Sequence, residues 1–329
     1  MSITIIAEAA QGYEGSETLA CLLVRAAAVA GADLVKFQLV YADEIATPDY
    51  QHFRLFRSLE MPDDAWAAVA AQASRSGIAT AFDVFGARSL ELARRLGARA
   101  VKIHATDFFH DALVGHAIDA LPEVFFSAAG IHLDEIRRFV ERCGTRADRL
   151  TLLHGFQAEP TATGDNHLRR IAALAAALPG LRIGFMDHAE GSVDEAGWLG
   201  VLAVPFGVTA IEKHITVEPS LALEDSVSAL DPVRFARYVQ RIRSAEAALG
   251  RADLALSPAE RTYRRRAVKV VVAAEPLGQE RAIEPGQVRL LRAPLDDGRE
   301  PMHDPALVVG RRLRRLIAAG EPVYAEDLW

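Results

Sequence analysis

The stretch TAIEKHITV, residues 209–217, decides the fold of this 329-residue chain. Its apolar residues are mostly β-branched, which is typical of a strand, yet its middle reads Glu-Lys-His. Because side chains alternate along a strand, Glu212 and His214 share one face. A strand whose inward face turns polar toward its end is typical of the mouth of a barrel.

Seven further short apolar runs precede this strand, and segments with apolar residues at helical spacing lie between them. Eight strands, each followed by a helix, over about 250 residues predict a (βα)8 TIM barrel. The spacing of roughly 30 residues fits one βα unit per strand. A doubly wound open sheet is the alternative. The expected strands are 3–8, 33–38, 78–83, 100–105, 124–128, 150–154, 182–185 and 210–214.

Polar residues stand at the C-terminal end of nearly every expected strand. The active sites of (βα)8 barrels are built at that end, whereas chance would scatter such residues among the strand middles. The pattern therefore favours the barrel over the open sheet. The strand-end residues are Glu8, Lys36, Gln38, Asp83, Lys102, Ser127, His154, Asp187, His188, Glu212 and His214.

Two of the ten histidines stand out because of their place on neighbouring strands. His188 follows the seventh strand and His214 ends the eighth. The ends of adjacent barrel strands lie close together, so both imidazoles can reach one point. The pair predicts a divalent-metal site with water in the open positions. We interpret the other eight histidines as packed or surface residues.

The character of the chain changes after the eighth helix. Residues 253–266 are polar and arginine-rich, and Pro258 is expected to break any regular structure there, which predicts a linker. The linker separates a barrel domain, residues 1–252, from a small domain, residues 267–329. The small domain has short β-rich runs with Pro and Gly turns. A domain of about 60 residues has a marginal core of its own.

Composition excludes several classes of protein. The formal net charge of −7 disfavours a nonspecific binder of nucleic acid or of an anionic membrane. The arginine runs at 264–266 and 311–315 are therefore interpreted as solvated faces or anion contacts. No apolar run approaches the roughly 20 residues needed to cross a bilayer. The N-terminal sequence has no features of a signal peptide, and the presence of only two cysteines argues against a disulfide framework, so we expect a cytoplasmic protein.

Beyond these patterns, the chain resembles the N-acetylneuraminate (sialic acid) synthase family. The matching stretches follow the family's order and extend over nearly the whole barrel. The tail, with AIEPGQVRLLRAP and VVGRRLRRLIAAGEPVYAEDL, resembles that family's antifreeze-like SAF domain. The resemblance implies a TIM barrel followed by a small β-rich SAF domain. The barrel stretches are IIAEAAQGYEGS, AGADLVKFQ, GIATAFDVF, AVKIHATDF, LLHGFQAEP, RIGFMDHAEGS, AIEKHIT and EDSVSALDP.

The resemblance also implies a reaction. Members of the family condense phosphoenolpyruvate with an open-chain aldose, such as N-acetylmannosamine or a related 6-deoxy sugar. The products are a 2-keto-3-deoxy nonulosonic acid and phosphate. A divalent ion, Mn²⁺ or Mg²⁺, assists by polarising the aldehyde. The family further implies a domain-swapped homodimer, in which each SAF domain covers the barrel mouth of the partner.

Residue roles carry over from the family to matching positions of this chain. Two lysines would compensate the charge of phosphoenolpyruvate, which needs cations in a partly dry site. Carboxylates and amides would contact water and the sugar, and the histidine pair would hold the metal. The catalytic residues are Glu8, Lys36, Lys102 and Asp107, the substrate-binding residues are Gln38, Ser127, Gln157, Asp225 and Arg292, and the metal ligands are His188 and His214.

The chain departs from the family around the phosphate pocket. After the fourth strand it reads KIHATD, where the family usually has glycines and a serine, and Met186 replaces another serine. Gln157 and Glu159 stand where the family usually has Asn and Tyr, and Ala293 replaces an arginine of the SAF domain. These changes indicate a divergent synthase. Two alternatives stay open: an aldolase-like lyase that uses Lys102 as a Schiff base, and a non-catalytic relative that binds a sugar or an anion.

Overall fold

Eight parallel strands close into a barrel in the computed structural model, which describes residues 2–155, 158–296 and 298–329. The strands follow one another around the barrel in chain order, and β1 pairs with both β2 and β8, which closes it. The prediction of a TIM barrel is confirmed. The strands are β1 (Thr4–Ala10), β2 (Leu34–Gln38), β3 (Ala79–Val84), β4 (Ala100–Ile103), β5 (Glu123–Ser127), β6 (Leu150–His154), β7 (Arg182–Asp187) and β8 (Ala210–His214).

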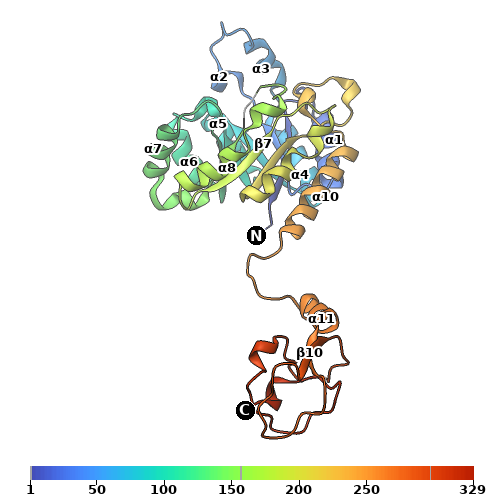
Figure 1. Cartoon of the computed structure of the whole chain (residues 1–329). Helices are drawn as coiled ribbons and strands as arrows, with labels where there is room; N and C mark the ends of the chain where they lie inside the picture. The colour runs from blue at the N-terminus through green and yellow to red at the C-terminus, as the bar shows by residue number, and fades with distance from the viewer. Residues whose placement is uncertain (1, 156–157, 297) are drawn as a thin grey trace. The chain divides into compact units, whose positions relative to one another are not determined.

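Each barrel strand leads into at least one helix, and Figure 1 shows these helices around the strands. The connection after β2 is the longest, because three helices follow it. In the part of the chain that the structure describes, no helix has the length and apolar character to cross a membrane. The helices are α1 (Glu17–Val29), α2 (Ala42–Ile45), α3 (Phe53–Leu59), α4 (Asp63–Ser76), α5 (Ala87–Arg95), α6 (Asp111–Ala120), α7 (Leu133–Cys143), α8 (Arg169–Ala177), α9 (Leu199–Ala203) and α10 (Pro232–Leu249).

Local capping signals set where these helices begin and end. At the start of α10, the Asp231 carboxylate accepts hydrogen bonds from the backbone N–H groups of Val233 and Arg234, at 2.9 and 3.0 Å. Such a cap is worth about 1 kcal/mol. At the end of α4, Gly77 adopts φ 69°, a left-handed conformation that is strained for any residue with a Cβ atom.

The inside of the barrel is layered. A ring of buried apolar side chains fills its lower part, and the next inward-facing residue of each strand lies two positions further along the chain. That next ring is mostly polar and forms the base of the mouth. The apolar ring is Ile6, Leu34, Ala81, Ala100, Phe125, Leu153, Met186 and Ala210. The ring above it is Glu8, Lys36, Asp83, Lys102, Ser127, Gly155, His188 and Glu212.

Residues 251–329 form a second compact unit, which we describe by itself. Strands β9 (Val270–Ala273) and β10 (Val288–Leu291) pair antiparallel, beside a small buried apolar cluster. Arg315 forms ion pairs with Asp327 at 2.6 Å and with Glu321 at 2.7 Å. Part of the arginine run at 311–315 therefore stabilises this unit internally.

Most of the predicted linker, 253–266, is a helix. Helix α11 (Pro258–Ala267) begins with a capping box, in which Ser257 Oγ accepts from the Glu260 N–H and the Glu260 carboxylate accepts from the Ser257 N–H. Pro258 occupies the first helical position, where a missing N–H leaves no hydrogen bond unmade. The expectation that Pro258 interrupts the structure was therefore wrong, because this proline begins the helix.

Candidate active site

The mouth of the barrel holds a polar cavity of about 220 Å³. Its walls come from at least six of the eight strand ends, so residues far apart in sequence meet there. The charged and polar composition of the walls suits anionic or hydroxylated ligands better than apolar ones. The lining residues are Glu8, Gln38, Asp83, Lys102, His104, Glu159, His188, Glu212 and His214.

The register of the strands accounts for these neighbours. Glu8 on β1 lies directly opposite His214 on β8, and Asp83 on β3 lies opposite Lys102 on β4. Glu212 precedes His214 by two positions on the same inward face. The carboxylate and imidazole of the TAIEKHITV stretch therefore both reach the mouth, as the alternation predicts.

Two buried lysines and three buried carboxylates form one ionic cluster at the base of the cavity. Lys36 donates to Glu8 and, at 2.8 Å, to Asp83. Lys102 donates to Glu212 at 2.6 Å, and Lys36 lies 3.6 Å from the other oxygen of that carboxylate. Three carboxylates against two lysines leave one net negative charge, which favours binding of a cation nearby.

The cluster perturbs the acidity of its members in opposite directions. Burial raises the pKa of Glu212, but the nearby Lys102 and Lys36 ammonium groups outweigh burial and bring it down to about 2. Burial lowers the pKa of Lys102, but Asp83 and Glu212 raise it above its ordinary value. The Lys102 side chain is therefore a charged ammonium at neutral pH.

His188 and His214 lie side by side at the mouth, with ring centroids 5.0 Å apart. Burial lowers the pKa of His188 to about 3 and that of His214 well below its ordinary value. Both rings are therefore neutral at pH 7, as metal ligands must be. The Nδ1 atom of each ring is buried without a hydrogen-bond partner among the described residues. Orphaned ring nitrogens of this kind fit a site that binds a cation.

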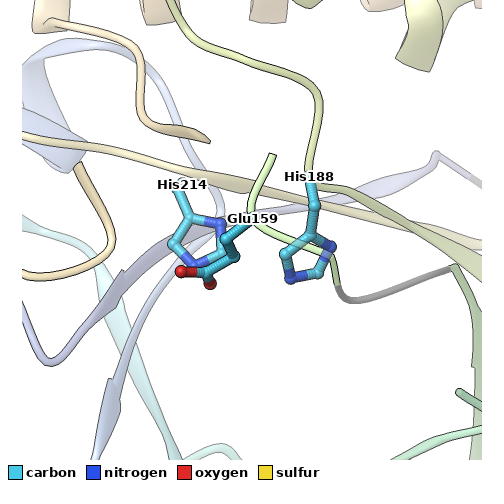
Figure 2. Close-up of side chains that lie close together, drawn as sticks. All are labelled: Glu159, His188 and His214. Atoms are coloured by element: carbon cyan, nitrogen blue, oxygen red, sulfur yellow. The ribbon is translucent and has the colours of Figure 1, made fainter. Parts of the chain in front are cut away.

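A third donor, the Glu159 carboxylate, approaches the two imidazoles. One ligand atom from each of the three side chains lies within 4.8 Å of the others. Figure 2 shows the side chains converging from β8, from the segment after β7 and from the segment after β6. Burial, followed by the nearby Asp225, raises the pKa of Glu159 to about 7. Two imidazoles and a carboxylate suit several divalent ions.

A second buried ion pair lies behind the histidines, on the outward face of the same strands. Lys213 donates to Asp187 at 3.1 Å and to the carbonyl oxygen of Ala189 at 2.8 Å. The Tyr238 hydroxyl, from α10, donates to the other Asp187 oxygen at 3.2 Å. Because Asp187 and Lys213 directly precede His188 and His214, this network fixes the strand ends that carry the imidazoles.

Comparison with known proteins assigns the barrel to a family. The sequence profile of the NeuB family matches residues 23–253, and that of the SAF domain matches residues 268–328. The chain belongs to the NeuB family. The resemblance drawn from the sequence motifs and the two-part architecture are both confirmed.

Named relatives of this NeuB protein are acid synthases and polysaccharide biosynthesis proteins. The N,N'-diacetyllegionaminic acid synthase of Legionella pneumophila is 27% identical, over 100% of this chain and 95% of the relative. The spore coat polysaccharide biosynthesis protein SpsE of Bacillus subtilis is 30% identical over 75% of this chain and 68% of its own length. Among solved structures, the N-acetylneuraminic acid synthetase of Leptospira borgpetersenii aligns with a TM-score of 0.73 at 25% identity, covering 81% and 93% of the two chains. The prediction of an enzyme of the acid-synthase type is confirmed.

Several predicted site residues of this NeuB chain meet at the mouth. Glu8, Lys102 and the two histidines line the cavity, and Lys36 lies fully buried beneath it. Gln38 also lines the cavity and accepts a hydrogen bond from Gln11 Nε2 at 2.8 Å.

Two other predicted residues, Asp225 and Ser127, do not line this cavity. Asp225 hydrogen-bonds to Glu159 and accepts from the Gln11 N–H at 3.2 Å. Ser127 is buried at the end of β5, where its Oγ accepts from the Ala129 N–H at 3.3 Å.

Among the predicted residues of the barrel, Asp107 does not line the cavity. Asp107 is in the short helix after β4 and accepts from the Thr106 hydroxyl at 2.7 Å. Arg292 is in the C-terminal unit, where its Nε donates to the Ala267 carbonyl oxygen at 3.1 Å. Gln157 lies outside the described residues. His154, at the end of β6, also stays out of the mouth, because its ring contacts the Asn166 carbonyl oxygen at 3.0 Å.

Three residues that shape the site were not among the predicted site residues. Asp83 and Glu212 were recognised only as polar strand ends, although they hold the two lysines. Glu159 was noticed only as a departure from the family. The signal for Glu212 was present in the opening stretch, because its alternation with His214 places both on the inward face. Nothing in the local sequence around Glu159 indicates that it turns toward the histidines.

Proposed function

We propose that this protein condenses phosphoenolpyruvate with an open-chain aldose, giving a 2-keto-3-deoxy nonulosonic acid and phosphate. The observation that supports this most strongly is the pairing of neutral His188 and His214 above a buried lysine–carboxylate cluster, at the mouth of a NeuB-family barrel. The names of the relatives, which include a legionaminic acid synthase, support the same product class.

The histidines would hold the divalent ion, which we propose to be Mn²⁺ or Mg²⁺. Such an ion, when bound, supplies Lewis-acid polarisation of a carbonyl oxygen. The buried location of His188 and His214 keeps both imidazoles neutral, so they need not lose protons before they bind a metal. The net negative charge of the lysine–carboxylate cluster favours a cation in the same cavity.

Phosphoenolpyruvate, the anionic substrate, would contact Lys102 before Lys36, because Lys102 lines the cavity while Lys36 lies beneath it. Lys102 stays charged, but its ammonium is already held by Glu212 at 2.6 Å. The phosphate or carboxylate group of phosphoenolpyruvate therefore competes with Glu212 for the hydrogen bonds that the Lys102 ammonium donates. Lys36, bound to Glu8 and Asp83, keeps those two carboxylates oriented and adds positive potential from below.

The polar side chains of the upper wall would handle water and the sugar. Glu8 lines the cavity, so we assign it contact with the water that adds to C2 of the donor and with the acceptor. Gln38 and Asp225, which both bond to Gln11, would contact sugar hydroxyls. Asp107, Ser127, Gln157 and Arg292 keep the family's implied roles in binding the phosphate and the sugar as predictions.

The Schiff-base alternative is less well supported by the geometry. An imine requires a neutral amine with a free lone pair. The Lys102 amine is protonated at neutral pH and paired with Glu212. Borohydride treatment in the presence of a carbonyl substrate would leave no covalent adduct on Lys102 under the synthase mechanism, and a trapped adduct would favour the lyase.

The experiment that tests the proposal identifies the product. The protein is incubated with Mn²⁺, phosphoenolpyruvate and a panel of aldoses that includes N-acetylmannosamine, 6-deoxy diamino hexoses, simple hexoses and pentoses. We expect one aldose class to give a mass equal to aldose plus pyruvate, with one phosphate released per product. Ligand binding without any such mass, in every aldose tested, would favour the non-catalytic relative.

We also infer a homodimer in which SAF domains are exchanged between subunits. The support is the SAF match at residues 268–328, together with the arrangement that the family resemblance implies. Light scattering should give about twice the chain mass of 35.7 kDa. A monomer at working concentration would exclude the exchange.

A further inference from the structure

We propose that Glu159 is a third protein ligand of the metal, beside His188 and His214, and that Asp225 positions it. This inference rests on the proposed function, because it assumes that the histidine pair holds the ion. It adds a carboxylate ligand at a position where the family, by the sequence resemblance, usually has a tyrosine. The metal site of this chain would then be a combination of two histidines and one carboxylate.

The geometry supports this assignment. Glu159 lines the same cavity as both histidines, and one carboxylate oxygen lies within 4.8 Å of a nitrogen of each ring. Figure 2 shows the Glu159 carboxylate next to the His214 ring, and Glu159 as a whole is exposed whereas both histidines are buried. Two ligands at right angles on one ion, each about 2.1 Å from it, are about 3 Å apart. Binding of an ion would therefore draw the three side chains closer together than they lie here.

The partners of Glu159 support the same conclusion. Among the described residues, neither Glu159 nor Asp225 forms an ion pair with a lysine or an arginine, although the two acids are hydrogen-bonded to each other. Two carboxyl groups can hydrogen-bond to each other only when one of them is protonated, so a proton here takes the place that a cation could fill. The buried Nδ1 atoms of His188 and His214 also have no hydrogen-bond partner in the described part of the chain. A divalent ion among these groups would replace that proton and give the imidazoles a partner.

Asp225 is suited to a positioning role. It adopts a left-handed backbone conformation with φ 60°, and one carboxylate oxygen accepts from the Gln11 N–H at 3.2 Å. Its place is therefore fixed by the loop after β1, and the hydrogen bond to Glu159 limits where that side chain can point. Partners of this kind orient metal-binding carboxylates in many proteins.

The test measures Mn²⁺ affinity of the full-length protein by calorimetry, after removal of metal with EDTA. We expect Glu159→Gln, which keeps the size but removes the charge, to weaken binding on the order of 10-fold or more. Glu159→Asp should recover part of the loss, because it restores a carboxylate. Glu224→Gln is the matched control, since Glu224 is an exposed acid next to Asp225 and should leave the affinity within twofold.

The histidine variants separate this inference from the proposed function. If His188→Ala and His214→Ala abolish Mn²⁺ binding while Glu159→Gln stays within twofold of the unmodified protein, the assignment of Glu159 is overturned and the histidine site stands. If the histidine variants bind Mn²⁺ normally, the proposed metal site fails as a whole. The melting temperature of each metal-free variant reports whether it is folded, and the visible spectrum of the Co²⁺-loaded protein gives a second readout of a lost carboxylate ligand.

Discussion

Replacing Glu212 by glutamine tests whether the buried ionic cluster holds the barrel mouth together. Glu212 accepts from Lys102 at 2.6 Å and lies 3.6 Å from Lys36, and its side chain is 1% exposed. Glutamine keeps the shape but not the charge. It would leave the Lys102 ammonium buried beside a neutral amide, which is costly.

The magnitude follows from the acidity of the carboxyl. A pKa of about 2 in the folded protein, against an ordinary value of 4.5, corresponds to about 3 kcal/mol in favour of the ionised form. We therefore expect Glu212→Gln to lower the free energy of unfolding by about 3 kcal/mol at pH 7, and the melting temperature by roughly 6–12 °C. Because the folded pKa is the lower one, this stabilisation is present above pH 4.5 and is lost as the pH falls toward 2.

The assay is urea unfolding of the metal-free protein at several pH values. Glu141→Gln serves as the control, because Glu141 is exposed on α7 and should change stability by less than about 0.5 kcal/mol. The stability difference between Glu212→Gln and the unmodified protein should shrink between pH 4.5 and 2. A variant as stable as the original at pH 7 would refute the reasoning, since desolvation of the cluster would then equal its internal attraction.

Three further predictions follow from the same structure. Lys213→Met leaves the buried Asp187 carboxylate without its ion pair and should lower the free energy of unfolding, measured in urea, by about 3–5 kcal/mol. The double variant that also carries Asp187→Asn should lose less stability than Lys213→Met alone, whereas strictly additive losses from the two changes would contradict a direct pairing. Gly191→Ala places a Cβ atom against the Ala229 carbonyl oxygen and should lower the melting temperature by several degrees, whereas Gly164→Ala, with open space around it, should not. Mn²⁺ at about 100 times its Kd should raise the free energy of unfolding by about 2.7 kcal/mol. EDTA should reverse this gain and His214→Ala should abolish it; an equal gain in the His214→Ala protein would place the ion elsewhere.

The fold could be predicted from the sequence because its signals are local and repeated. Each strand alternates inward and outward residues, and most inward faces change from apolar to polar at the base of the mouth, as Ile6 and Glu8 show. The histidine pair could be predicted for the same reason, since adjacent parallel strands bring their ends together.

The rest of the site depends on contacts that local pattern does not encode. That Glu212 would hold Lys102, 110 residues away, follows only from closure of the barrel. Glu159 reaches the histidines from a loop, whose path is not set by any periodicity. Pro258 was misread because a proline between polar residues fits both a break and a first helical position, and the capping box with Glu260 decides between them.

The most direct test of the proposed chemistry is the rate of phosphate release from phosphoenolpyruvate. It is measured with and without the best aldose, in Mn²⁺ and in EDTA, for the unmodified protein, His188→Ala and His214→Ala. We expect release that requires the aldose, the metal and both histidines. Release that is independent of the aldose, or that persists at full rate in the histidine variants, would contradict a metal-assisted condensation at this barrel mouth.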